Sequence, residues 1–467
     1  MSSTTHRIER DSMGERSIPA EVYYGIRKPL RALDNFPISG LPPLPIYVDA
    51  CLLIKKAVAL VNGELGCIPA EIAAPIITAA DDLLAGSLRD QFVVDIYQAG
   101  AGTSHHMNVN EVLANRALEL SHQPKGRYDL ISPNDHVNYG QSTNDVIPTA
   151  IRIAALLSLH SGLLATLPLL VTALNHKGEA FAEIVKSGRT HLQDAVPVRL
   201  GDSFTAYGVI LTEHHQRITA ASQDLQKLGI GGSAAGTGMN THPEYRRRVV
   251  AQLAELTGLN LEPAPHMMAA MQSMAPFVGL SGSLRNLAQD CVKMANDLRL
   301  LDSGPMTGLK EIQLPPVQPG SSIMPGKYNP VMAEMLTMVC FQVMGLDQSI
   351  ALCAQAGQLE LNVMMPLIAY DLLHSLQILN NALQAFTHRC IAGIQAQRET
   401  CQRYADRTLA LVTALNPHIG YLKAAEVANS VLKTGQSVRE VVLSQGLMDP
   451  AQVDEVLDIA ALSRMMP

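Results

Sequence analysis

Apolar residues recur at intervals of three and four over most of the 467-residue chain, the spacing of helices that bury one face. The pattern predicts helical segments from Tyr47 to Ala85 and from Val109 to Leu120. Longer ones are predicted over about residues 146–185, 199–228, 267–302 and 330–395. Few strands are expected, and residues 1–45, rich in Pro, Gly and charge, are expected to be irregular. The sequence therefore predicts a mainly α fold with long helices, which are typical of an extended bundle.

The pattern of breaks suggests how the chain is divided. Long apolar-periodic segments begin after about residue 140, and near residue 398 they give way to shorter ones that contain Pro417 and Gly420. We therefore expect an N-terminal domain over residues 1–140, a central helical bundle over 141–397 and a small C-terminal domain over 398–467.

Composition excludes some classes of function. The chain is 47% apolar but only 4% aromatic, so its core must be aliphatic, and its net charge of -7 gives no basic surface for nucleic acid. The apolar stretch from Ile153 to Leu174 reaches membrane-spanning length but contains His160 and Pro168, which favours a buried helix pair over a membrane span. The seven cysteines form no CxxC pair, and the polar start "MSSTTHRIERD" has no apolar segment. We expect reduced thiols, no membrane association and a cytoplasmic location.

Four polar breaks between the helices share one chemistry. They hold small hydroxyls, amides and few cations: Thr103, Ser104, Asn108, Gln141, Ser142, Thr143, Asn144, Thr190, His191, Ser321, Ser322, Lys327 and Asn329. Such a set suits a small polar anion, although any one cluster can also simply cap a helix. Four clusters together favour a binding site, because long helices can bring distant breaks to one place.

The break "GSSIMPGKYNP", residues 320–330, is the richest of these. Its glycines free the backbone to present N–H groups, its serines add hydroxyls, and Lys327 adds a full positive charge. Oriented donors beside a lysine can stabilise an anion derived from a carboxylate. The preceding "LPPVQP" suggests a mobile lid, while a simple cap on the helix that starts near Pro330 is the alternative.

Other motifs exclude several chemistries. The glycines of "GIGGSAAGTGMN" follow no predicted strand and precede no acidic residue at the dinucleotide-binding distance. The adjacent histidines His105–His106 and His214–His215 lack the HExxH spacing of a zinc-binding helix. Neither a P-loop nor a GxSxG motif occurs. His191, set among hydroxyls and amides, is a candidate for either a catalytic or a structural role.

Several of these segments resemble one known family. "GSSIMPGKYNP", "AGAGTSHHMNVNEVLANRA", "PNDHVNYGQSTNDVIPTA" and "GRTHLQDAVP" are similar to the aspartase/fumarase superfamily, in the branch of aspartate ammonia-lyases and class II fumarases. The resemblance implies a three-domain helical subunit with a central long-helix bundle, assembling as a homotetramer whose active sites are each shared by three subunits. It also implies a small dicarboxylate substrate and reversible anti-elimination to fumarate, with no organic cofactor and no metal among the site residues. An activating divalent cation is left open.

The resemblance also assigns roles to individual residues. Ser321 matches the general base, Lys327 and Asn329 match the residues that bind the carboxylate next to the reacting carbon, and Glu334 matches the acidic partner of His191. Further substrate-binding positions are implied at Thr103, Ser104, Ser142, Thr143, Asn144, Thr190 and Ser322.

The choice of leaving group rests on fewer positions. Ala101, Ser104 and Thr143 follow the aspartase pattern, whereas "DSMG" and "MPGK" are common in fumarases. We therefore expect deamination of L-aspartate, with class II fumarase as the alternative and a non-catalytic structural protein as a remote one. His106 stands where an asparagine is usual, Ser132 where a histidine is frequent, and Lys28 and Pro29 where a threonine-containing turn is expected. His106 is expected to affect the amine pocket or the response to pH.

Overall fold

The structure is a computed structural model that describes residues 5–98 and 100–464. These residues are mainly helical, which confirms the predicted fold class. Contacts divide the chain into two compact units. Unit 1 comprises Met1–Ala165, Gln216–Ala288 and Phe341–Asn380, and unit 2 comprises Thr166–His215, Gln289–Cys340 and Asn381–Pro467. This division follows contacts and not chain order, so the three domains expected from the sequence remain a prediction.

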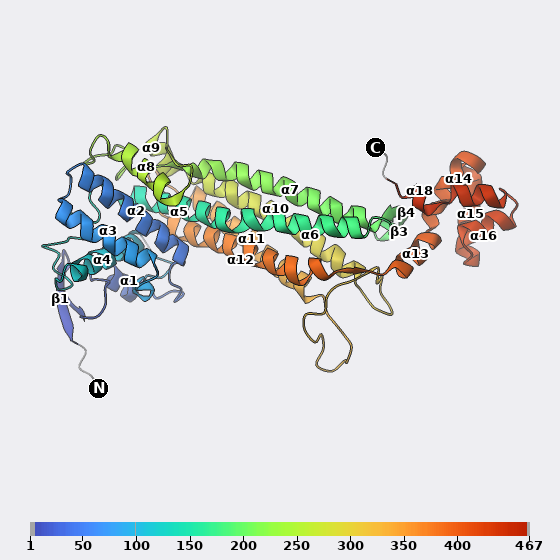
Figure 1. The fold of residues 1–467 in the computed structure, drawn as a ribbon, viewed down its shortest axis with the longest axis horizontal. Helices are drawn as coiled ribbons and strands as arrows, with labels where there is room; N and C mark the ends of the chain where they lie inside the picture. Colours follow the sequence, from blue (N-terminus) through green and yellow to red (C-terminus); the bar gives the residue numbers. More distant parts are fainter. Residues whose placement is uncertain (1–4, 99, 465–467) are drawn as a thin grey trace. The chain divides into compact units, whose positions relative to one another are not determined.

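Unit 1 holds several shorter helices. They are α1 (Pro29–Asn35), α2 (Pro45–Glu64), α3 (Ala70–Leu84), α4 (Thr103–Leu120), α5 (Thr143–Ser158), α8 (Tyr245–Thr257) and α9 (Met267–Gln272). Figure 1 shows α2, α3 and α4 lying side by side. Helix α2 begins at Pro45, whose fixed φ suits a first helical turn, and it buries a run of Ala, Val, Leu and Ile side chains.

Two small sheets also belong to unit 1. β1 (His6–Asp11) and β2 (Gly14–Pro19) form an antiparallel hairpin, and β5 (Lys227–Leu228) pairs in parallel with β6 (Glu262–Pro263). The expectation that residues 1–45 are irregular was therefore wrong for the first hairpin and for α1. Only Glu9 and Ile18 are buried in that hairpin, so its side-chain alternation is too weak to read from the sequence.

The long helices carry the strongest periodicity, and the boundary between the units falls within them. They are α6 (Leu164–Ala180), α7 (Leu200–Ser222), α10 (Ala275–Leu301), α11 (Val331–Gln355) and α12 (Met365–Arg389). The segment predicted over 330–395 is thus two helices joined by a connection at residues 356–364, and that over 146–185 is α5 and α6 joined by a π-helical turn, η2 (Leu159–Leu163).

Unit 2 contains a hairpin and a group of C-terminal helices. β3 (Val185–Thr190) and β4 (Gln193–Arg199) are antiparallel and connect α6 to α7 (Figure 1), and β7 (Ile312–Gln313) pairs with β8 (Gln395–Ala396). The C-terminal helices are α13 (Arg398–Arg407), α14 (Val412–Ile419), α15 (Tyr421–Thr434), α16 (Val438–Ser444), α17 (Pro450–Val456) and α18 (Ile459–Leu462). Helices α14 to α18 share a hydrophobic cluster of their own that includes Leu415, Val427 and Val442.

Two helical segments are long and apolar enough to cross a membrane by length and composition. They are Thr143–Ala180 and Val331–Gln355, and 56% and 44% of their most apolar windows are buried. Helices inside the core of a protein pass the same test. The expectation of no membrane association stays a prediction.

Candidate functional site

Two helix N-termini meet in unit 1. Thr103 begins α4 and Thr143 begins α5, and the Thr143 hydroxyl donates to the Thr103 hydroxyl over 3.3 Å. Gly102 permits this approach, because a Cβ there would lie 3.1 Å from Ile147 of α5. The positive ends of two helix dipoles therefore face the same region, an arrangement that attracts anions.

The loop before α4 is held in an unusual conformation. Gly100, Ala101 and Gly102 adopt φ values of 77°, 58° and 93°, all in the left-handed region. For Ala101, which is buried, this conformation costs about 1–2 kcal/mol, since its Cβ approaches the following carbonyl. Strain of this kind is concentrated at functional sites, where it fixes the direction of donors.

The N-terminus of α5 is capped by protein groups alone. Ser142 and Asp145 form a capping box, and buried Asp145 accepts N–H bonds from Ser142 (2.9 Å), Gly231 (3.0 Å) and Ser233 (2.9 Å). Burial raises the pKa of Asp145 to about 6, although these donors act to lower it. The glycine-rich segment after α7 thus binds a carboxylate of its own chain, which agrees with its rejection as a dinucleotide site.

The other predicted residues here lie close by. The Asn144 amide donates to the Ala234 carbonyl over 2.8 Å, and Ser104 is buried in the first turn of α4. A polar hollow of about 580 Å³ opens beside them, lined in part by Asn138, Gln141 and Ser233.

Beneath the two threonines lies a polar pair, His106, which the sequence singled out, and Lys55, which sequence reasoning missed. His106 Nδ1 is 2.8 Å from the Thr143 hydroxyl, and its Nε2 is 2.6 Å from Lys55 Nζ. Lys55 also donates to the side-chain oxygens of Asn138 (3.1 Å) and Gln141 (2.7 Å). Lys55 and His106 are 0% and 1% exposed, so water does not satisfy either group.

Burial decides the protonation of this pair. It lowers the pKa of Lys55 to about 7 and holds the pKa of His106 well below its ordinary value, with Lys55 acting in the same direction on the histidine. His106 is therefore neutral. The sequence did carry one indication of Lys55: it lies on the α2 stripe with Cys51, Val58 and Asn62, all of which are buried.

In unit 2, Thr190 and His191 lie at the tip of the β3–β4 hairpin. His191 and Leu192 form its two-residue turn, with φ values of 55° and 59°, and both side chains are exposed. Such turns normally take Asn and Gly, which adopt a positive φ readily. A histidine followed by a leucine therefore marks a strained position. Strand β3 is anchored by buried Glu311, whose carboxylate is 2.9 Å from Arg189 and 3.2 Å from Lys186.

The loop that contains Ser321 closes on itself. The Asn329 amide donates to the Gly320 carbonyl over 2.8 Å, and a Cβ at Gly320 would lie 2.1 Å from the Lys327 carbonyl oxygen, so only glycine fits there. The Ser321 Oγ accepts N–H bonds from Ile323 (3.3 Å) and Met324 (3.0 Å). Two donors directed at one oxygen stabilise its anionic form.

Ser322 and Lys327 are exposed, and Glu334 pairs with Arg299 at 3.7 Å. Among the hydrogen bonds and ion pairs in the described part of unit 2, none joins Glu334 to His191. The predicted pairing of Glu334 with His191 and the assigned role of each site residue remain predictions.

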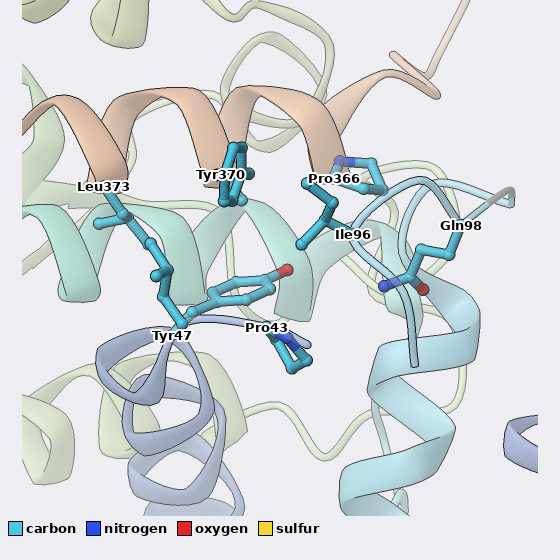
Figure 2. Close-up of a pocket in the computed structure, with 9 residues that line it drawn as sticks. Pro43, Tyr47, Ile96, Gln98, Pro366, Tyr370 and Leu373 are labelled. Atoms are coloured by element: carbon cyan, nitrogen blue, oxygen red, sulfur yellow. The ribbon is translucent and has the colours of Figure 1, made fainter. Parts of the chain in front are cut away.

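Within residues 5–98 and 100–464, no three His, Cys, Asp or Glu side chains are arranged to hold a metal ion. The crevice in Figure 2, between Tyr47 of α2, the segment with Ile96 and Gln98, and Tyr370 of α12, has a cavity volume of about 20 Å³. That is enough for one water-sized molecule, so the crevice is too small for a dicarboxylate.

Comparison with known proteins decides the family. A family model described as "Lyase" matches residues 14–345, and one described as "Fumarase C C-terminus" matches residues 411–464. The chain belongs to this lyase family. The resemblance to the aspartase/fumarase superfamily, read from the loop at 320–330 and its companions, is thereby confirmed.

The lyase resembles relatives with two different names. It is 46% identical to an aspartate ammonia-lyase of Bacillus subtilis, over 97% of this chain and 95% of that protein. It is also 46% identical to a class II fumarate hydratase of Thermosynechococcus vestitus, over 97% of each chain. A solved structure described as fumarate lyase:delta crystallin from Brucella melitensis bound to cobalt is 44% identical, with a TM-score of 0.95 over 99% of this chain and 100% of that one. The fold of the lyase is therefore that of these enzymes, while overall identity does not separate the two leaving groups.

Proposed function

We propose that this lyase converts L-aspartate reversibly to fumarate and ammonia. The observation that carries the proposal is the meeting of two helix N-termini at the Thr103 and Thr143 hydroxyls, which suits one carboxylate of a small dicarboxylate. Ammonia is favoured over water by the pattern at Ala101, Ser104 and Thr143. Further aspartate ammonia-lyases, of Helicobacter pylori and Escherichia coli, are 45% identical over at least 96% of this chain, which supports the same choice.

The proposed chemistry needs a base and an anion clamp. Ser321, as the alkoxide stabilised by its two N–H donors, removes a proton from the carbon next to one carboxylate, and the electron pair moves into that carboxylate. Lys327 and Asn329 stabilise the resulting aci-carboxylate, with Thr190 and His191 alongside and Glu334 as the orienting partner of His191. The electrons then return to form the double bond, the C–N bond breaks, and ammonia leaves.

The same balance makes an organic cofactor unnecessary. The electron pair released from the C–H bond becomes the second bond of the C=C double bond, and the C–N bonding pair leaves with the nitrogen, so no oxidant or reductant enters the reaction. Enzymes of this family act on small dicarboxylates and are oligomeric. We place the reaction in the cytoplasm, where free thiols such as the seven cysteines of this chain persist.

We further propose a homotetramer whose active sites each draw on three subunits. Several observations support it. Thr190, His191 and Lys327 are exposed in the single chain, although buried donors act most strongly on a developing charge. Helix α11 also exposes large apolar side chains, Met338 (65%), Phe341 (58%) and Leu352 (53%), at helical spacing.

A substrate assay tests the function. The purified chain is incubated with L-aspartate and, separately, with L-malate, and fumarate is followed by its ultraviolet absorbance. We expect fumarate from aspartate, with release of one ammonia for each fumarate. Fumarate from malate alone would establish the fumarase alternative, and none from either would favour a structural protein. Repeating the assay with a chelator and then with added Mg²⁺ shows whether a divalent cation activates the enzyme.

A further inference from the structure

A continuous chain of hydrogen bonds links a buried ammonium to the substrate-binding threonines. Its steps are Lys55 to His106 (2.6 Å), His106 to Thr143 (2.8 Å) and Thr143 to Thr103 (3.3 Å). The chain passes from α2 through α4 to α5 and back to the first residue of α4. We propose that His106 is a positioning residue that sets the direction of this relay, and that its tautomer makes the donor strength of the Thr103 hydroxyl depend on pH. The proposal deepens the proposed function and rests on it for the role of the two threonines.

The contacts of Lys55 define one end of the relay. An ammonium has three protons, and Lys55 has three acceptors: His106 Nε2 and the side-chain oxygens of Asn138 and Gln141. A protonated Lys55 therefore has each proton bound. Its burial is compensated by these contacts and by the attraction of nearby Asp145.

The direction of the remaining steps follows from this end. Because Lys55 donates to Nε2, a neutral His106 must carry its proton on Nδ1. Nδ1–H then donates to the Thr143 oxygen, and the Thr143 hydroxyl donates to Thr103. The Thr103 oxygen is thus an acceptor from Thr143, which strengthens its own proton as a donor toward a carboxylate.

Loss of the Lys55 proton reverses the chain. A neutral amine can accept a hydrogen bond from Nε2–H, and His106 Nδ1 then becomes an acceptor for the Thr143 hydroxyl. Thr143 no longer donates to Thr103. The other groups around the pair are Lys28 before α1, Cys51 on α2, His105 on α4 and Asp145 on α5. Burial and the positive charge of Lys28 disfavour a charge on His106, so the histidine responds by changing tautomer and not by becoming a cation.

An asparagine in place of His106 tests the direction of the hydrogen-bond relay separately from its change with pH. Asparagine offers one acceptor and one donor, as neutral histidine does, but it has no tautomers. His106→Asn should therefore preserve the relay in one direction at every pH, whereas His106→Leu removes it at similar volume. His105→Phe is the matched control, since His105 stacks on Tyr47 at 4.6 Å and lies outside the relay.

The test is the pH profile of kcat/KM for the wild type and the three variants, from mildly acidic to alkaline pH. We expect His106→Leu to lose about tenfold, the equivalent of one hydrogen bond. His106→Asn should keep most of the rate at neutral pH and lose the alkaline decline of the wild type, and His105→Phe should keep the wild-type profile. A His106→Leu enzyme within about twofold of wild type, or an alkaline decline that persists in His106→Asn, overturns the proposal. If His106→Leu does not fold, the His106→Asn profile alone decides.

Failure of the relay can be told apart from failure of the proposed function. If the wild type acts on malate and not on aspartate, the profiles are measured with malate. If it acts on neither, calorimetry with succinate reports binding at the threonines: weaker binding by His106→Leu than by His105→Phe supports the relay, and equal binding contradicts it.

Discussion

At the scale of single residues, Glu111 is the clearest case of a group that burial controls. It lies within α4, is 0% exposed, and accepts N–H bonds from Gly25 (3.3 Å) and Arg27 (3.0 Å). Burial, followed by the charge of neighbouring Glu9, raises its pKa to about 8. A carboxyl group at that position is therefore protonated in the folded protein at neutral pH.

This pKa makes a prediction about stability. Because the folded-state pKa lies above the unfolded value of about 4.3, the folded protein holds a proton that the unfolded chain releases, and stability falls as the pH rises between those values. Glu111→Gln removes the titration, so its melting temperature should decline less than that of the wild type from mildly acidic pH to about pH 8. Exposed Glu71→Gln is the control and should follow the wild type. Parallel curves for wild type and Glu111→Gln would contradict the assignment.

The residues of the candidate site differ in how well the sequence predicted them. Ser321, Lys327 and Asn329 sit in one short motif, so their proximity was readable. For Lys55 the sequence offered only its place on a buried stripe of α2, because its acceptors Asn138 and Gln141 lie 83 and 86 residues away in the sequence. A buried lysine becomes plausible only when such partners are known.

At the scale of elements, the cap of α5 joins two distant segments. Asp145 accepts from its own N-cap residue and from Gly231 and Ser233, so the position of Thr143 depends on a loop that is 86 residues or more away. The substrate-binding end of α5 is therefore stabilised by tertiary contacts as well as by local capping.

Removing that carboxylate should affect both stability and binding. Asp145→Asn leaves one acceptor oxygen for the three N–H donors. It also places the amide N–H group against at least one of those donors, at a cost of about 1–3 kcal/mol. We expect a lower melting temperature and a higher KM for aspartate, because Thr143 shifts. Asp449→Asn is a matched control, since Asp449 forms the capping box of α17 at an exposed position. Equal effects of the two substitutions on KM would argue against the coupling.

Elements were predicted unevenly, for a physical reason. Long helices such as α10 and α11 follow from periodicity alone. The β3–β4 hairpin was expected only as a polar break, because its turn residues, His191 and Leu192, are not those that two-residue turns favour. Its geometry is imposed by the anchoring of Arg189 and Lys186 on Glu311, a contact that spans more than 100 residues.

At the scale of the whole molecule, assembly can be tested by subunit complementation. Ser321→Ala and Thr143→Val each remove one hydroxyl and should each lose most turnover while keeping the oligomeric mass of the wild type. If each site combines these residues from different subunits, oligomers that contain both variants should regain part of the wild-type rate, because some sites then hold two intact residues. The rate is measured on co-expressed, co-purified mixtures.

A second mixture controls for this result. Ser321 and Lys327 lie on the same loop, so oligomers of Ser321→Ala with Lys327→Ala should show no recovery. If the Ser321→Ala and Thr143→Val mixture also stays inactive, the two residues belong to one subunit's site and the shared-site proposal is wrong.

The exposed tip of the β3–β4 hairpin has a consequence for enzyme concentration. His191 projects from a strained turn and has no cover within the described part of its own unit, so its function depends on what neighbouring subunits bring to it. Dilution that separates the subunits should therefore leave folded but inactive protein. The specific activity should fall as the total enzyme concentration falls, by mass action. A saturating dicarboxylate, which binds only the assembled site, should protect the enzyme against this loss.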